Sequence, residues 1–215
     1  MIFNSLDFIE KLSVEERLNH LGNKRKKPSS TKTFRSNMML NPLRLKHINN
    51  IDNLNCDMVT LNLEDAIAPS RKKEALHNIA FFLSHLEASN TFIIVRTNPL
   101  DEGGREEIAF LDSFSFDAVR VAKVKTRDEI LEIGILLNSE KEIHISLETK
   151  EAFANLATFG GIEKFTTANW ASSVIGRKRQ SNHTVHTFKV LGRCTNSWVK
   201  SYLIYVSRVQ RCRWV

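Results

Sequence analysis

Six short apolar runs, separated by segments of helical periodicity, constrain the fold of this chain more than any other feature. Each run is five to seven residues long, which suits strands that are buried on both faces of a parallel sheet. The runs cover residues 34–40, 58–63, 92–97, 119–124, 143–147 and 164–169. Between them, the segments 71–86, 106–113, 126–137 and 151–159 carry apolar residues at the i, i+3, i+4 spacing of amphipathic helices. The pattern predicts alternating strands and helices, with strands that begin about 20 to 35 residues apart.

This alternation favours an α/β fold of the TIM (β/α)8-barrel type over a Rossmann sheet, because no GxGxxG or Walker-type loop follows any of the runs. About six β/α units are recognisable, so we expect the barrel to be incomplete. We assign residues 34–169 to this partial barrel domain. Residues 1–33 are expected to form an N-terminal helical appendage, with a helix over 5–21 and a solvated linker that includes the basic run 24–27.

Polar residues follow the apolar runs in an orderly way. In a TIM barrel the chemistry lies at the carboxyl ends of the strands, so these residues are candidates for a functional site. A single one of them would more often be a solvated loop charge, but five strand ends in register favour a site. The residues are Glu64 and Asp65 after the second run, Arg96 in the third, Lys123 in the fourth, Glu148 after the fifth and Asn169 at the end of the sixth.

The same positions carry motifs of a known family. The stretch from Leu63 to Ala75, which reads LEDAIAPSRKKEA, resembles the "DLEDAVAP…K…A" signature of the HpcH/HpaI aldolase and citrate lyase beta-subunit family. Three further blocks agree with the family in order and spacing, namely Phe34-Arg35-Ser36, Val95-Arg96-Thr97-Asn98-Pro99 and Leu147-Glu148-Thr149. The resemblance covers about residues 34–169. It implies a magnesium-dependent lyase or aldolase that makes or breaks carbon–carbon bonds in an acyl-CoA or a 2-oxo acid through a metal-stabilised enolate.

The resemblance also implies how the substrate would be bound. Arg96 becomes the clamp for a substrate carboxylate, a role that suits a planar guanidinium able to hold both oxygens. Arg35, from the first block, would bind the substrate as well. Lys123 would add positive charge beside the anionic substrate and counts among the expected catalytic residues.

For the metal, the resemblance makes Glu148 the Mg²⁺ ligand. Glu64 and Asp65 become catalytic residues that line the outer shell of the ion, because Mg²⁺ usually keeps several waters and takes only one or two carboxylates directly. The alternative is that Glu64 and Asp65 cap the following helix, but Pro69-Ser70 already supplies a helix start.

The chain departs from the family pattern at two acids. The first acid of the signature is Asn62 here. The second Mg²⁺ ligand, an Asp that the family places just beyond the sixth strand, is absent, since the chain reads Asn169-Trp170-Ala171-Ser172-Ser173 at this point and no acid follows Glu163. One carboxylate with waters is a weak Mg²⁺ site.

The composition changes at the same place. Residues 170–215 hold nine of the 31 Lys and Arg and none of the 24 Asp and Glu, which leaves residues 1–169 with 22 basic and 24 acidic side chains. We hypothesise that a frameshift or truncation replaced the family's C-terminal part, so that 170–215 is a basic, acid-free tail of unassigned structure. A catalytically dead truncated remnant is therefore the alternative to an active lyase.

Net charge and cysteine usage bear on partners and location. The net charge of +7 makes a basic nucleic-acid-binding protein the competing class, but no RRM, KH or helix-turn-helix pattern accompanies the basic residues, so we place it last. No long apolar segment or secretory signal is present, so no membrane partner is expected. Three scattered cysteines fit a reducing cytoplasm. The resemblance implies a small-molecule substrate and, for intact family members, a homo-oligomer.

Overall fold

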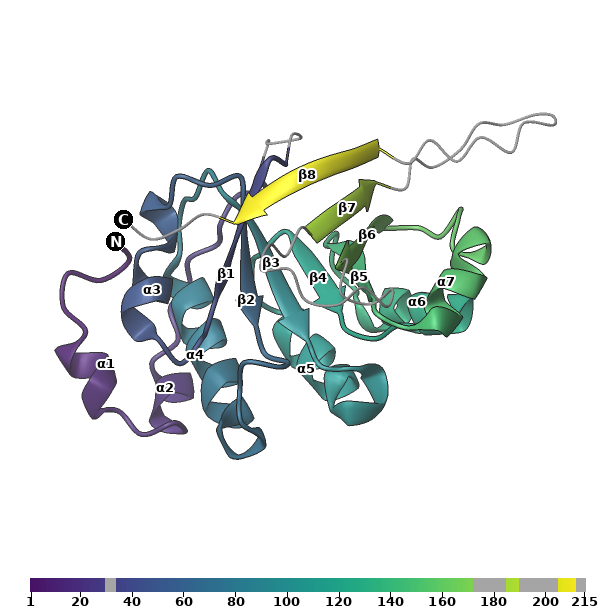
Figure 1. Ribbon diagram of the computed structural model, residues 1–215. Helices are drawn as coiled ribbons and strands as arrows, with labels where there is room; N and C mark the ends of the chain where they lie inside the picture. Colours follow the sequence, from purple (N-terminus) through teal and green to yellow (C-terminus); the bar gives the residue numbers. More distant parts are fainter. Residues whose placement is uncertain (30–33, 172–184, 190–204, 212–215) are drawn as a thin grey trace.

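The sheet is built from six parallel strands that lie in sequence order. The computed structural model describes residues 1–29, 34–171, 185–189 and 205–211 (Figure 1). The strands are β1 (Ser36–Leu40), β2 (Met58–Asn62), β3 (Phe92–Thr97), β4 (Ala118–Val121), β5 (Glu142–Leu147) and β6 (Phe165–Ala171). Each pairs in parallel with the next. All six runs predicted from the sequence are confirmed as strands, with bounds that agree to within three residues.

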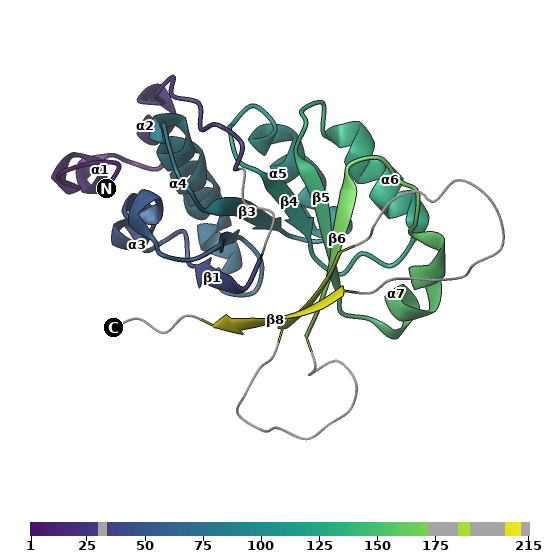
Figure 2. The same ribbon diagram turned by 90° about the horizontal axis from the view of Figure 1, so that it is seen from above.

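Helices cover the outer side of the curved sheet, as the view from above shows (Figure 2). They are α3 (Leu45–Asn49), α4 (Lys72–His85), α5 (Gly104–Leu111), α6 (Arg127–Leu136) and α7 (Lys150–Asn155), with short 3-10 turns η1 (Ile51–Asn53), η2 (Pro69–Arg71), η3 (Leu100–Glu102) and η4 (Leu156–Thr158). Local sequence explains some of the boundaries. Thr126 and Glu129, for example, form a capping box that begins α6. Within the described ranges, no helix is both long and apolar enough to cross a membrane.

Two apolar layers hold the fold together. The larger layer lies between helices and sheet, where side chains such as Ile79, Val95 and Ile133 are fully buried. The smaller layer lies at the amino ends of β2, β3 and β4 and is made of Met58, Phe92, Ile94 and Ala118, with Phe34 packed against it. Because parallel strands bury both faces, the sheet needs apolar side chains on each side.

The last two strands join the sheet by antiparallel pairing. β7 (Val185–Lys189) pairs antiparallel with β6, and β8 (Tyr205–Arg211) pairs antiparallel with β7. β8 then meets the start of β1 through two residue pairs, which links the eight strands into a ring. An antiparallel pair thus stands where two further β/α units would close a parallel barrel. The predicted incomplete TIM-type fold is confirmed, and β7 pairs with the edge of β6 where a seventh parallel strand would lie.

The N-terminal appendage forms two short helices rather than the single helix predicted over 5–21. They are α1 (Asp7–Lys11) and α2 (Glu16–Asn19). The Ser13 amide donates to Glu16 Oε2 at 2.8 Å, and the Glu16 amide donates to Ser13 Oγ at 3.2 Å. This reciprocal pair starts a new helix at that point. Ile9 of α1 is only 1% exposed and belongs to the main core, so the appendage packs against the barrel.

A buried ion pair anchors the segment that leads from the appendage to β1. Lys26 Nζ lies 2.8 and 3.0 Å from the carboxylate oxygens of Asp117, and both side chains are buried. Asp117 also accepts the amides of Ser29 at 2.8 Å and Ile93 at 2.7 Å. These extra bonds matter because a buried ion pair is tolerated only when its remaining hydrogen-bonding capacity is used. The sequence predicts a solvated linker that includes the run 24–27. For Lys26 this prediction is wrong, because its side chain is buried against Asp117.

Candidate functional site

The ends of β2, β3 and β5 bring three charged side chains together. Arg96 Nη2, in β3, lies 2.5 Å from Glu148 Oε1, just after β5. The same nitrogen forms an ion pair with Glu64 Oε2, just after β2. Arg96 and Glu64 are buried, whereas 26% of the Glu148 side chain is exposed. Because the strands are parallel, their carboxyl ends form one mouth, and Arg96 is the cation at its centre.

Two further predicted residues lie at the rim of this mouth. Lys123 Nζ is 3.7 Å from Glu64 Oε1. Asp65 Oδ2 is 3.9 Å from Arg96 Nη2, with 72% of its side chain exposed. The structure therefore brings together five of the six residues to which the sequence assigns a role, namely Glu64, Asp65, Arg96, Lys123 and Glu148.

Lys123 is held in an uncommon backbone conformation. Its φ is 53°, in the left-handed region that residues with a side chain rarely adopt. Lys123 lies two residues after the end of β4, and its Nζ is 3.7 Å from Glu64 Oε1 and 3.9 Å from Glu102 Oε1. Strained positions of this kind gather at functional sites, so the conformation agrees with a role for Lys123 in the mouth.

Backbone contacts explain why Glu64 is buried beside Arg96. The Leu63 amide donates to the Arg96 carbonyl at 2.8 Å, which continues the pairing of β2 with β3 beyond the end of β2. The Glu64 amide donates to Asn62 Oδ1 at 3.1 Å. Asn62, which replaces the first acid of the family signature, thus supplies a neutral oxygen that fixes the turn.

Burial raises the pKa of both carboxyls that contact Arg96. For Glu64, loss of hydration is the largest cause; Arg96 opposes it, the charges of Glu148 and Asp65 add to it, and the pKa rises to about 7. The pKa of Glu148 is also raised, again mainly by burial, although Arg96 lowers it. The single positive charge of Arg96 therefore does not offset the free-energy cost of burying both Glu64 and Glu148 in their ionised forms.

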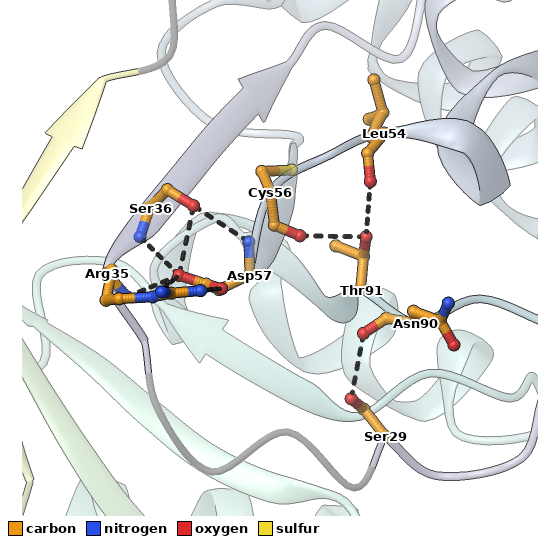
Figure 3. Close-up of polar contacts among 8 residues, drawn as sticks. All are labelled: Ser29, Arg35, Ser36, Leu54, Cys56, Asp57, Asn90 and Thr91. Carbon is orange, nitrogen blue, oxygen red and sulfur yellow. Dashed lines mark hydrogen bonds and ion pairs between the residues drawn. The ribbon is translucent and has the colours of Figure 1, made fainter.

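Arg35 lies at the opposite end of the barrel from the other predicted residues. It precedes β1, and its Nη2 pairs at 3.0 Å with Oδ1 of Asp57, which precedes β2 (Figure 3). The amides of Arg35 and Ser36 both donate to Asp57 Oδ2, at 2.7 and 3.0 Å. Because the strand starts lie opposite the mouth, the structure does not bring Arg35 to Arg96. Its contacts hold the starts of two strands together.

The carboxylates of the mouth are the candidate ligands for Mg²⁺. Glu64 and Glu148 are two carboxylates whose charge Arg96 does not offset, and Mg²⁺ usually takes one or two carboxylates and keeps several waters. Glu64 Oε1 accepts no hydrogen bond from any described residue. In the described part of the chain, no cluster of three or more His, Cys, Asp or Glu side chains could hold a metal. The described residues therefore offer Mg²⁺ at most the two carboxylates of Glu64 and Glu148, and waters would have to complete its coordination. The positions from 172 onward, where the family has its second acid, lie outside the described residues.

Our sequence reasoning missed two buried polar residues in the interior of the barrel. Arg120 of β4 is 4% exposed and His144 of β5 is 1% exposed. The strand register pairs Arg96 with Arg120 and Arg120 with His144, so the three lie in one row across β3, β4 and β5. A polar side chain inside an otherwise apolar run, as in 119–124 and 143–147, is the signal that could have revealed them.

A cleft of about 530 Å³ opens beside the turn that carries Glu64 and Asp65. Its lining comes from the loops after β1 and β2 and consists of Asn41, Leu43, Arg44, Ala66, Ala68 and Arg71. Arg71 also pairs with Glu74 at 2.8 Å. Arg44 therefore gives this cleft a positive charge beside the mouth, whereas the charge of Arg71 is balanced by Glu74.

Comparison with known structures supports the fold. RipC from Yersinia pestis is 16% identical with a TM-score of 0.53, and the match covers 66% of this chain and 60% of that one. CitE from Mycobacterium tuberculosis, in complex with magnesium and acetoacetate, is 15% identical with a TM-score of 0.56, over 70% and 62% of the two chains. The citrate lyase beta subunit from the same organism, complexed with oxaloacetate and magnesium, is 14% identical with a TM-score of 0.55, over 70% and 66%. The chain thus spans 60 to 66% of the length of these relatives.

Comparison of the sequence gives the family. Among curated proteins, no match was found. A model of the HpcH/HpaI aldolase/citrate lyase family matches residues 35–172, which is more than half of the 215 residues and includes every motif quoted above except the start of the first block. The chain therefore belongs to the HpcH/HpaI aldolase/citrate lyase family.

Proposed function

We propose that the mouth of this barrel is the substrate site of a magnesium-dependent carbon–carbon lyase or aldolase, which acts next to a carbonyl group in an acyl-CoA or a 2-oxo acid. One observation carries this proposal. Arg96 is held between the carboxylates of Glu64 and Glu148 at the carboxyl ends of the strands, where TIM-barrel enzymes carry out their chemistry.

Arg96 would hold the substrate through a carboxylate. Its Nη2 is used by the two glutamates, but its Nε is buried and has no hydrogen-bond partner among the described residues. A guanidinium offers five donors in a fixed fork, so donors remain for a planar carboxylate. Such a contact would orient the reacting carbonyl group toward Glu64 and Glu148.

Glu64 is the residue best suited to move a proton. Its pKa of about 7 allows its carboxyl group to accept and return a proton near neutral pH. Lys123, with Nζ 3.7 Å from Glu64 Oε1, would stabilise the charged form after the proton has left. The rim position of Lys123 also places positive charge beside an anionic substrate.

Glu148 would be the direct Mg²⁺ ligand, and Glu64 and Asp65 would accept hydrogen bonds from the waters of the ion. When bound, Mg²⁺ supplies positive charge that stabilises the negative charge developing on the substrate's carbonyl oxygen. The solved relatives with bound magnesium support this cofactor for the family.

The neighbouring cleft supports an acyl-CoA as one substrate class. Arg44 and Arg71 line it, and its 530 Å³ opens next to Asp65. Guanidinium groups bind phosphate oxygens well, so the cleft would suit the phosphates of a CoA chain whose acyl end enters the mouth. A CitE structure with coenzyme A supports the same class.

A second candidate function, ligand binding without turnover, is favoured by the antiparallel strands. β7 and β8 stand where two β/α units would complete the mouth, and no acid follows Glu163. A catalytically inactive remnant would keep Arg96, Glu64 and Glu148 but lack the part of the mouth that two further β/α units would supply.

A coupled assay panel separates the two candidates. The full chain would be incubated with Mg²⁺ and citryl-CoA, malyl-CoA, citramalyl-CoA or simple 4-hydroxy-2-oxo acids. Product formation that requires Mg²⁺ and is lost in Glu148→Gln supports the lyase, and the matched Glu142→Gln variant, at the other end of β5, should keep it. Silence with every substrate, together with retained ligand binding, supports the remnant. Silence with no binding contradicts both.

A further inference from the structure

Arg120 is a buried cation without an acid partner. It lies in the middle of β4 and is 4% exposed. Among the described residues, no ion pair includes Arg120. All 24 Asp and Glu of the chain lie within the described ranges, so no acidic side chain elsewhere remains to pair with it.

The side chain of Arg120 crosses the interior of the barrel. Its Nη1 donates to Thr60 Oγ1 at 3.4 Å, and Thr60 belongs to β2, which is separated from β4 by β3. Thr60 in turn donates to Asn37 Oδ1 of β1 at 3.1 Å. Arg120 therefore points inward, into a polar layer that includes side chains from β1 and β2.

Three guanidinium nitrogens in this layer lack an acceptor. Nε and Nη2 of Arg120 are buried and have no hydrogen-bond partner among the described residues, and the same holds for Nε of Arg96. Arg96 and Arg120 are paired in register on neighbouring strands, which lie about 4.8 Å apart in any sheet. The unused donors thus come from two adjacent positions that share the same interior.

An uncompensated charge of this kind is unfavourable in a folded protein. Buried donors without acceptors lose their hydration and gain nothing in return. Burial and the nearby charge of Arg96 lower the pKa of Arg120 to about 9, so the guanidinium still carries its proton at neutral pH. The charge of Glu148 opposes this shift in part, but both Glu148 and Glu64 form their ion pairs with Arg96 and neither forms one with Arg120.

We propose that the interior of the barrel, below the mouth, binds a small anion between Arg120 and Arg96. The ligand chemistry is a carboxylate group or an inorganic anion of similar size. The apolar layer of Met58, Phe92, Ile94 and Ala118 lies at the amino ends of the strands and limits how deep the anion can sit. The site shares Arg96 with the proposed substrate site, but it needs neither Mg²⁺ nor turnover and depends on Arg120, so it can be tested separately from the lyase proposal.

Thermal unfolding of the full chain without metal tests the site. Formate is the probe, and it replaces the bulky anion gluconate at constant ionic strength. Because a ligand that binds only the folded chain stabilises it, the unfolding midpoint of the wild type should rise over about a hundredfold range of formate concentration. Arg120→Met should abolish this rise, whereas Arg105→Met, a matched change at an exposed arginine paired with Glu132, should keep it. A wild-type midpoint that is equal in formate and gluconate overturns the proposal, as does an unchanged rise in Arg120→Met.

Two additions keep the test decisive. If Arg120→Met does not fold, Arg120→Lys takes its place. This variant keeps the positive charge but loses the planar guanidinium, so its unfolding midpoint should rise clearly less in formate than that of the wild type. A response equal to the wild type would contradict a site built on the guanidinium. Competition then identifies the natural source of the anion. If formate weakens oxaloacetate binding, the site takes a carboxylate of the ligand; if oxaloacetate affinity is unchanged while the midpoint still rises, the site takes a separate small anion.

Discussion

Arg96 Nη2 and Glu148 Oε1 lie 2.5 Å apart, and this contact joins the ends of β3 and β5. Glu64 forms an ion pair with the same nitrogen, so the ends of three strands share one cation. Since both acids are destabilised as anions by burial, the loss of Arg96 would leave two carboxyl groups in a mouth that favours their neutral forms. Arg96 is therefore the residue on which the site depends most.

Replacing Arg96 by Lys should weaken the binding of a carboxylate ligand by about 2 to 3 kcal/mol, because an ammonium cannot hold both oxygens as the guanidinium fork does. Calorimetric titration with oxaloacetate or pyruvate measures this directly. Arg35→Lys is the matched control, since Arg35 pairs with Asp57 at the opposite end of the barrel, and its affinity should equal that of the wild type. Unchanged affinity in Arg96→Lys would remove Arg96 from the site.

Turnover by the chain should be slow. We expect Mg²⁺-dependent rates well below about 1 per second with any acyl-CoA or 2-oxo acid, because the antiparallel pair β7 and β8 replaces the strands and loops that would complete the mouth. Introducing an acid by Ser172→Asp should not restore activity, since one added Mg²⁺ ligand does not replace the missing strands and loops of the mouth. Ordinary enzymatic rates in the unmodified chain would show that the tail completes the site and that the frameshift hypothesis is wrong.

Loss of Lys26 should destabilise the fold much more than loss of its neighbour Lys24. Lys26→Met leaves the buried carboxylate of Asp117 without its cation, a change that typically costs about 3 to 5 kcal/mol. Lys24 pairs with Glu87 in solvent, and such pairs contribute about 0 to 1 kcal/mol. Denaturant unfolding of Lys26→Met and Lys24→Met gives both values. Equal stability of the two variants would contradict the anchoring role of Lys26.

Stability should fall in acid partly through Asp57. Its hydrogen bond with Arg35 is the largest cause that lowers its pKa from 3.8 to about 2. In this range the unfolded chain binds more protons than the folded chain, so the contribution of Asp57 is fully present above pH 3.8 and is lost as the pH falls toward 2. Asp57→Asn and Arg35→Met should both flatten the pH dependence of the unfolding free energy in this window. If the unfolding free energy of either variant depends on pH as steeply as that of the wild type between pH 2 and 3.8, the Arg35–Asp57 pair does not cause this dependence.

The sequence was sufficient for the parallel part of the fold. Strands such as β2 and β3 are buried along their whole length, and their ends are marked by Glu64 and by Arg96, so both their position and the meeting of the two charges could be predicted. Arg35 shows where the motif alone misleads. It precedes its strand, and parallel topology places strand starts away from the mouth.

Other features depend on contacts that no local pattern records. The pairing of β7 with β6 joins segments across a change in composition, and β7 lies outside the six apolar runs that predict the parallel strands. The inward direction of Arg120 follows from the register that places it beside Arg96, which periodicity along one strand cannot supply. The burial of Lys26 likewise depends on Asp117, a residue 91 positions away.

Calorimetric titration of oxaloacetate into the full chain, with and without Mg²⁺, tests the central claim most directly. If Glu64, Arg96 and Glu148 form a joint site for a carboxylate and a divalent cation, Mg²⁺ should strengthen oxaloacetate binding by about tenfold or more in the wild type, as expected when two ligands favour the same arrangement. Glu148→Gln should lose this effect while it keeps the weaker binding to Arg96. Equal affinity with and without Mg²⁺ in the wild type, or an undiminished effect in Glu148→Gln, would contradict the account.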